Sequence, residues 1–259
     1  MKIANRIQEV KKFHQILDDG VHQERILLVK APSSYGKSHL IDRFTQICHE
    51  SPKVKIVNLD LTDSNSGVAY FISRIQRKLR TERFPQYEKE IRRFLETQNI
   101  EMSDIEIEGN ENTLQILLNT DETVKQQRLR QLELAFFQDL ERIQGTLVIL
   151  IDSFEKASDD LKKWIRATLL PEVAEQLSGL RIVIAGQEVP EASSEWRSCH
   201  HCCELKPITE VDIWYEYAQA KQWQVTKEIV YGFVVGLQGH PRDIVECLVR
   251  VHQDQGVKL

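Results

Sequence analysis

Apolar residues alternate between continuous runs and helical spacing over most of the chain. The continuous runs predict strands at residues 25–30, 54–61, 146–151 and 180–185, with a short fifth strand at 204–205. Helical spacing predicts helices near the amino terminus, after residue 36, at 67–80, up to about residue 143, and from residue 161 to a stop near Pro171. Strands that alternate with helices favour an α/β fold with a parallel β-sheet flanked by helices.

Two segments depart from this alternation. Residues 83–124 are polar and charged, and we expect an insertion there, with a small hairpin that turns near Gly109. From Thr209 onward the pattern is purely helical, with helices expected at 211–221, 227–237 and 241–252. We therefore predict a core over residues 1–207 and a small C-terminal helical lid domain, here called the lid, over 208–259.

The composition of the 259 residues narrows the class of protein. Hydrophobic residues make up 41% and charged residues 28%, and the net charge of −5 gives no overall attraction to nucleic acid or anionic membrane. No apolar run approaches the roughly 18 residues that span a bilayer. Five cysteines, an odd number, do not form a disulfide framework, which favours a cytoplasmic location. The cluster Cys199–Cys203 could bind zinc, but without a second distant pair of ligands we favour a plain loop.

The segment between the first strand and its helix has the pattern of a phosphate-binding loop. Its candidate ligand-binding residues are Ala31, Pro32, Ser33, Ser34, Tyr35, Gly36, Lys37, Ser38 and His39. In such a loop the main-chain N–H groups surround phosphate oxygens, Lys37 adds a positive charge, and the hydroxyl of Ser38 is a ligand for Mg²⁺. A surface turn that matches by chance is the alternative.

Three polar residues follow the next buried strands at the expected carboxyl edge of the sheet. Asp152 ends the run at 146–151, where its carboxylate could hold Mg²⁺ beside Ser38. Glu155 could activate the water that attacks a γ-phosphate, and Gln187 could contact that phosphate. The structural alternatives are a helix N-cap for Asp152, a first-turn acid for Glu155 and a loop amide for Gln187.

Five short elements occur in a fixed order along the chain. They are Asn5-Arg6 with Glu9, the loop around Lys37, Ile151-Asp152-Ser153-Phe154-Glu155, Ala185-Gly186-Gln187 and Gly239-His240-Pro241. This set resembles the nucleotide-binding module of STAND NTPases, signalling ATPases that include NACHT and NB-ARC proteins and are related to AAA+ ATPases. The chain departs from the family pattern at Ala31, which replaces a glycine, and at Gln187, which is often arginine.

The resemblance implies that Arg6, His240 and Pro241 lie around an adenine and link the two parts of the molecule. It also implies that ATP or ADP binds with Mg²⁺, and that an arginine such as Arg166 or Arg181 could reach a neighbouring subunit. A surface charge for Arg6 and a plain interhelical turn at 240–241 are the alternatives.

We therefore expect an ATP-binding switch that hydrolyses slowly and acts on a protein partner or by self-association, as an isolated module or a fragment of a longer protein. The alternatives are a nucleotide-binding module without turnover and a DNA-associated ATPase. The basic stretch from Arg74 to Arg93 could contact nucleic acid, but we favour a solvated helix face.

Overall fold

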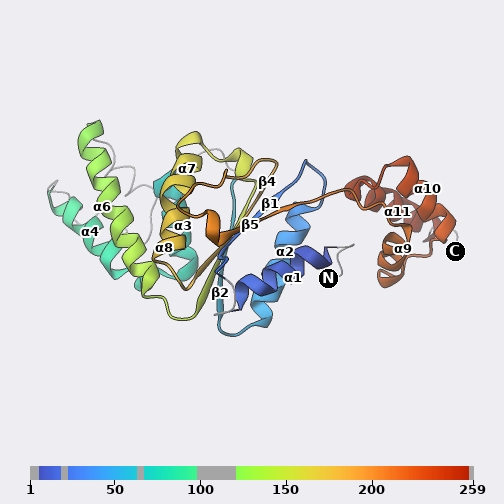
Figure 1. Cartoon of the computed structure of the whole chain (residues 1–259), viewed down its shortest axis with the longest axis horizontal. Helices are drawn as coiled ribbons and strands as arrows, with labels where there is room; N and C mark the ends of the chain where they lie inside the picture. The colour runs from blue at the N-terminus through green and yellow to red at the C-terminus, as the bar shows by residue number, and fades with distance from the viewer. Residues whose placement is uncertain (1–5, 19–22, 63–66, 98–120, 257–259) are drawn as a thin grey trace.

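The computed structural model describes residues 6–18, 23–62, 67–97 and 121–256 (Figure 1). Its centre is a parallel sheet of five strands in the order β2-β3-β4-β1-β5. The strands are β1 (Ile26–Lys30), β2 (Val54–Asp60), β3 (Thr146–Asp152), β4 (Leu180–Gly186) and β5 (His200–Glu204). The predicted α/β fold with a parallel sheet is confirmed, and β3 and β4 are buried along their whole length, as continuous apolar runs require.

The fifth strand is the one strand whose predicted position was wrong. We expected it at residues 204–205, with a loop over Cys199–Cys203, but β5 covers His200–Glu204 and pairs with β1. A short 3₁₀ helix (Arg197–Cys199) precedes it. As an edge strand, β5 is only partly covered, so it lacks the apolar run that identifies a central strand. Among the described residues, no group of three or more His, Cys, Asp or Glu side chains is placed to hold a metal ion.

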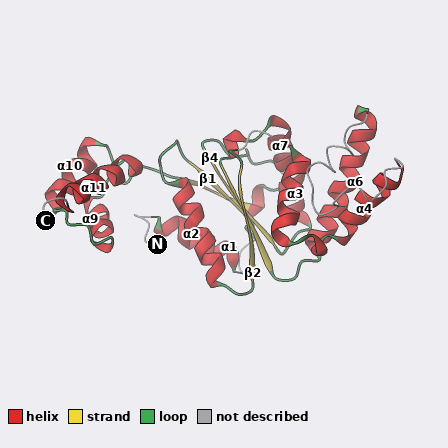
Figure 2. Cartoon of the chain, turned by 180° about the vertical axis from the view of Figure 1, so that it is seen from behind, coloured by secondary structure: helices red, strands yellow, loops and turns green. Residues whose placement is uncertain are grey.

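Helices cover both faces of the sheet (Figure 2). On one face, α1 (Ile7–Leu17) and α2 (Lys37–Glu50) pack on alternate strand residues, and the rings of Phe13 and Phe44 stack with centroids 4.1 Å apart. On the other face, α3 (Val68–Leu79) and the helices described below build the larger apolar core. The loop before α2 thus lies at the carboxyl edge of the sheet, where ligands bind in open α/β folds.

The segment at 83–124 contains a helix that the sequence analysis missed. Helix α4 (Pro85–Thr97) follows a 3₁₀ turn (Thr81–Arg83) and packs against α6 (Glu122–Glu141). Its buried residues Tyr87, Ile91, Phe94 and Leu95 have the spacing of a helical face. The carboxylate of Asp139 in α6 accepts the main-chain N–H groups of Gln86 and Tyr87, both at 2.9 Å, and so caps α4. The hairpin expected near Gly109 lies outside the described residues.

The expected helix stop near Pro171 was also wrong. Helix α7 (Asp159–Trp164) continues through a π-helical segment (Ile165–Leu169) into α8 (Leu170–Glu175) without a break. Pro171 lies in the first turn of α8. The wider π-helical turn shifts the hydrogen-bond pattern, so that the missing N–H of Pro171 falls where a helix start tolerates it.

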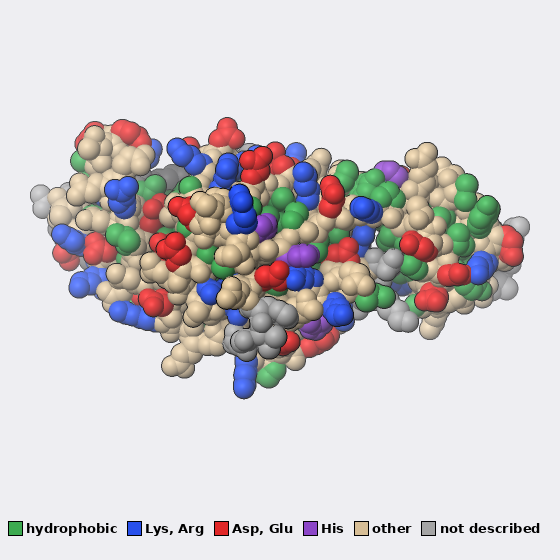
Figure 3. All heavy atoms as spheres, in the orientation of Figure 1, with side chains coloured by type: hydrophobic (Ala, Val, Ile, Leu, Met, Phe, Trp, Pro, Cys, Tyr) green, Lys and Arg blue, Asp and Glu red, His purple; other side chains and the backbone are tan. Residues whose placement is uncertain are grey.

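Three helices form the lid at the carboxyl end of the described chain: α9 (Val211–Ala220), α10 (Lys227–Gly236) and α11 (Pro241–Gly256). They enclose a separate apolar cluster that includes Trp214, Val230 and Leu248. Figure 1 shows them beside the carboxyl edge of the sheet, and Figure 3 shows the lid in surface view as a distinct lobe. Pro241 begins α11, as its sequence position predicts. No helix in the described part of the chain is both long and apolar enough to cross a membrane.

Candidate functional site

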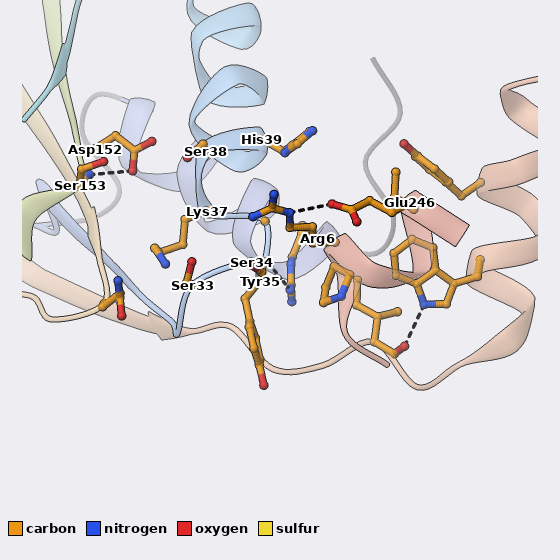
Figure 4. A pocket seen from close by; sticks show the side chains of 18 of the residues that line it. Arg6, Ser33, Ser34, Tyr35, Lys37, Ser38, His39, Asp152, Ser153 and Glu246 are labelled. Carbon is orange, nitrogen blue, oxygen red and sulfur yellow. Dashed lines mark hydrogen bonds and ion pairs between the residues drawn. The ribbon is translucent and has the colours of Figure 1, made fainter. Parts of the chain in front are cut away.

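A cavity of about 480 Å³ lies between the loop before α2, the ends of β3 and β4, and the lid (Figure 4). Most of the predicted site residues line it: Arg6, Ser33, Ser34, Tyr35, Gly36, Lys37, Ser38, His39, Asp152, Glu155, Gln187 and Pro241. Ala31, Pro32 and His240 do not line it but contact residues that do. Segments far apart in the sequence therefore meet at one site.

The loop before α2 presents a row of main-chain donors. Ser34 has φ 72° and Gly36 has φ 87°, both in the left-handed region that few residues other than glycine adopt easily. The main-chain N–H groups of residues 33–38 donate no hydrogen bond to any other described residue. Successive N–H groups in such a turn form a concave site for anions, and the N-terminus of α2 adds to its positive potential.

Lys37 is folded back onto this loop. Its Nζ donates hydrogen bonds to the carbonyl oxygens of Ala31 and Pro32, both at 2.8 Å, and the side chain is only 9% exposed. Burial lowers the pKa of Lys37, although the carboxylates of Glu155 and Asp152 oppose that effect. Ala31 and Pro32 thus contribute through their carbonyl groups, and the ammonium group is held at the cavity wall.

Asp152 and Ser38 bring two oxygen groups to the same cavity. Asp152 ends β3, is 8% exposed, and accepts the main-chain N–H of Ser153 at 2.8 Å through Oδ1. It does not cap the following helix, because Ser158 caps α7. A carboxylate and a hydroxyl are the kind of ligands that Mg²⁺ prefers, so the donor set fits that ion.

Glu155 lies in a short 3₁₀ helix (Phe154–Lys156) and contacts the end of β4. Its Oε2 accepts the main-chain N–H of Gln187 at 2.9 Å, and its Oε1 accepts the side-chain amide of Gln187 at 3.3 Å. Burial alone would raise the pKa of Glu155, but these hydrogen bonds and the charge of Lys37 outweigh it and lower that pKa. Glu155 and Gln187, both predicted site residues, are therefore joined by two hydrogen bonds.

Two of the residues predicted to lie around an adenine, Arg6 and His240, contact Tyr35 of the loop before α2. The guanidinium of Arg6 donates to the carbonyl oxygens of Tyr35 and Lys206, and the ring of His240 meets that of Tyr35 edge to face with centroids 5.0 Å apart. Gly239 has φ +74°, and a Cβ there would lie 2.7 Å from the main-chain oxygen of Ile208. These contacts link the lid to the loop before α2.

Several lining residues were not predicted as site residues. They are Ser153, Ile208, Trp214, Tyr217, Arg242, Val245 and Glu246. Most belong to the lid, where helical spacing does not distinguish a residue that lines a cavity from one that packs in the core. Arg242, directly after Gly239-His240-Pro241, places a cation in the wall, where its Nε donates to Glu246 at 2.9 Å. The apolar side chains among them offer a surface on which an aromatic base could stack.

Arg166 and Arg181, the two arginines that could reach a neighbouring subunit, differ in how far they are exposed to solvent. Arg181 is 4% exposed and donates to the carbonyl oxygens of Ile16 and Ser178, so that role is wrong for it. Its guanidinium ties α1 to the loop before β4. Arg166 is 52% exposed, lies 3.9 Å from the carboxylate of Glu191, and does not line the cavity.

Comparisons with known proteins agree with this geometry. A profile of one protein family, described as the KAP family P-loop domain, matches residues 6–168. No curated protein matches the chain. Among solved structures, a signal transduction ATPase with numerous domains (STAND) and a tetratricopeptide repeat sensor, from Pyrococcus horikoshii, is similar over 92% of this chain, with 14% identity and a TM-score of 0.51.

Two further structures are similar over nearly the whole chain. Cdc6p from Pyrobaculum aerophilum matches over 99% of it, with 12% identity and a TM-score of 0.60. A structure of the Drosophila ORC bound to DNA matches over 96% of it, with 14% identity and a TM-score of 0.53. This chain spans 28%, 64% and 60% of the lengths of the three proteins. At these identities the likeness shows a shared fold.

Proposed function

Because this chain belongs to the KAP family of P-loop NTPases, we propose that it binds ATP or ADP with Mg²⁺ and acts as a slowly hydrolysing, nucleotide-dependent switch. The observation that supports the proposal is that three parts of the chain line the same cavity. Phosphate-loop residues, the acids at the sheet edge and the side chains of the lid all face the same space. A nucleotide there would contact both parts of the molecule, so its state could change how they pack.

The phosphate end of the proposed ligand has complementary groups in place. The N–H groups of residues 33–38 have no acceptor in the part of the chain that the structure describes, and Lys37 can exchange its bonds to two carbonyl oxygens for bonds to phosphate. Ser38 and Asp152 would hold Mg²⁺, which when bound neutralises phosphate charge. The adenine would stack on the apolar lid residues Trp214, Tyr217 and Val245.

Slow hydrolysis is supported by the state of Glu155. A general base must reach the attacking water, but both carboxylate oxygens of Glu155 accept hydrogen bonds from Gln187. A γ-phosphate that attracted the amide of Gln187 would free one of these oxygens. The same contact favours the second candidate function, a nucleotide-binding module without turnover, if Gln187 never releases Glu155.

Three measurements test the proposal. Mass spectrometry of the purified protein would identify a bound adenine nucleotide, and equilibrium binding would show a preference for Mg·ATP over Mg·GTP. Phosphate release by the wild type should exceed that of Glu155→Gln, while equal background rates would favour the inert module. Hydrogen exchange over residues 236–248 should differ between the ADP-bound and ATP-bound states, because the start of α11 contacts the phosphate loop through Arg242 N–H to Ser34 O at 3.3 Å.

A further inference from the structure

The guanidinium of Arg6 joins two segments that lie far apart in the sequence. Its NH2 group donates to the carbonyl oxygen of Tyr35 at 3.0 Å and to that of Lys206 at 3.1 Å. The side chain is 7% exposed, and the carboxylate of Glu9 lies 3.7 Å away. Burial of a charged group is costly unless it is paired, so the position of Arg6 is maintained by these specific partners.

The bond to Tyr35 fixes the orientation of one peptide unit in the phosphate loop. In a trans peptide the C=O and the following N–H point in opposite directions, and no peptide bond among the described residues is cis. When Arg6 holds the carbonyl of Tyr35, the N–H of Gly36 must therefore point away from Arg6. That N–H is one of the loop donors without a described acceptor.

The neighbouring peptide unit is held in the same way from the lid. The main-chain N–H of Arg242 donates to the carbonyl oxygen of Ser34 at 3.3 Å, which turns the N–H of Tyr35 to the opposite side. Two successive loop carbonyls are thus bound from outside the loop, one by a side chain and one by the first turn of α11. The N–H groups of Tyr35 and Gly36 have no acceptor among the described residues, so both can donate to an anion.

The bond to Lys206 connects the same guanidinium to residues 205–208, the segment that leads from the sheet into the lid and is here called the root of the lid. Leu205 N–H donates to Lys30 O at 2.9 Å at the sheet edge, and Ile208 N–H donates to Gly239 O at 2.9 Å within the lid. Lys206 lies between these two anchors, where the chain passes from one part to the other. If this segment moved, the hydrogen bond from Arg6 to Lys206 would shift the guanidinium. The orientation of the peptide between Tyr35 and Gly36 would then change with it.

We propose that Arg6 is a positioning residue for the polyphosphate, because it orients the Gly36 N–H and couples that orientation to the root of the lid. This inference rests on the proposed nucleotide site and names a new role within it. It differs from a contact between Arg6 and the adenine, because its effect concerns the phosphates and not the base.

The test separates the phosphate end of the ligand from the base end. Mg·ATP, Mg·GTP and inorganic tripolyphosphate compete with a fluorescent ATP analogue for wild type, Arg6→Met and Arg6→Lys. We expect Arg6→Met to weaken ATP and tripolyphosphate by the same factor, about tenfold, since one charge-assisted contact is lost indirectly. Arg6→Lys keeps the charge and can donate to one carbonyl, so its loss should be smaller, and the ratio of ATP to GTP affinity should stay constant.

Arg25→Met is the matched control. Arg25 donates through NH1 to the carbonyl oxygen of Val173 at 2.8 Å and does not line the cavity, so its loss should leave tripolyphosphate affinity unchanged. An Arg6 variant that weakens ATP but not tripolyphosphate, or that alters the ATP to GTP ratio, would overturn the inference in favour of a base contact. If Arg6→Met does not fold, Arg6→Lys gives the same comparison. A wild type that binds none of the three ligands would overturn the proposed function itself.

Discussion

The carboxylate of Glu155 is bound at both oxygens by Gln187, through the main-chain N–H at 2.9 Å and the side-chain amide at 3.3 Å. Gly186 makes this approach possible, because a Cβ there would lie 2.9 Å from Oε2 of Glu155 and 2.3 Å from the main-chain oxygen of Glu188. The residue before Gln187 must therefore be glycine for the contact to form. Sensing of a phosphate by Gln187 and base catalysis by Glu155 would then depend on each other.

Replacement of Gln187 by leucine should move the acidic limb of ATP turnover to higher pH. The side-chain hydrogen bond stabilises the charged carboxylate and lowers the pKa of Glu155, so its loss raises that pKa, while the main-chain bond remains. A base acts when deprotonated, so turnover of the variant should fall at a higher pH than that of the wild type. Phosphate release across the pH range measures this shift, with the exposed Gln138→Leu as control.

The same pKa gives a prediction for stability. Since the pKa of Glu155 is lowered in the folded state, its contribution to stability is present above the unfolded pKa and is lost as pH falls through the folded pKa. Denaturant unfolding of wild type and Glu155→Gln should therefore differ more at neutral pH than in acid. A difference that stays constant with pH would show that Glu155 is not specifically stabilised as a carboxylate.

Replacement of Lys37 by alanine should weaken ATP binding by about 10- to 100-fold, since a charge-assisted contact to phosphate is worth roughly 1.5–3 kcal/mol. The ammonium group is buried at the cavity wall, where its attraction to phosphate is little screened by water. Calorimetric titration with Mg·ATP measures the change, and the exposed Lys78→Ala serves as control. Wild-type affinity in Lys37→Ala would refute the assignment of the loop.

Two glycines of the lid should respond to alanine in opposite ways. Gly239 has φ +74° and lies against the main chain of Ile208, so Gly239→Ala should destabilise the lid by at least about 1–2 kcal/mol. Gly232, inside α10, has open space around its Cα, so Gly232→Ala should stabilise it by up to about 1 kcal/mol. Thermal unfolding compares the two variants, and an equal response would contradict the role of Gly239 at the junction.

Removal of the Asp139 carboxylate should destabilise the α4–α6 pair. Asp139→Ala leaves the N–H groups of Gln86 and Tyr87 without their acceptor in a buried setting, at a cost of about 2–4 kcal/mol. Asp139→Asn keeps one acceptor oxygen and should lose less. Urea unfolding measures both, and equal losses would mean that packing, not capping, determines the effect.

Local patterns in the sequence were sufficient for the central strands and the phosphate loop. The runs that form β3 and β4 are apolar because both faces of a central strand are buried, and that constraint acts residue by residue. The edge strand β5 and the helix through Pro171 were misread, because each depends on neighbours: β5 on its pairing with β1, and Pro171 on the π-helical turn before it. The buried residues of α4 have helical spacing in the sequence, but the many charged residues between them favoured the interpretation as a polar insertion.

The sequence by itself identified the residues that we propose to carry the chemistry: the loop that ends at Lys37 and Ser38, the carboxylates Asp152 and Glu155, and the amide of Gln187. Only the tertiary structure decided what these groups contact. Hydrogen bonds between residues 29 and 200 positions apart, such as those from Arg6 to Tyr35 and Lys206, leave no periodic signal in a sequence. They form because distant chain segments meet at the carboxyl edge of the sheet. The strand order and the packing of the lid, which bring them together, arise only in the folded structure.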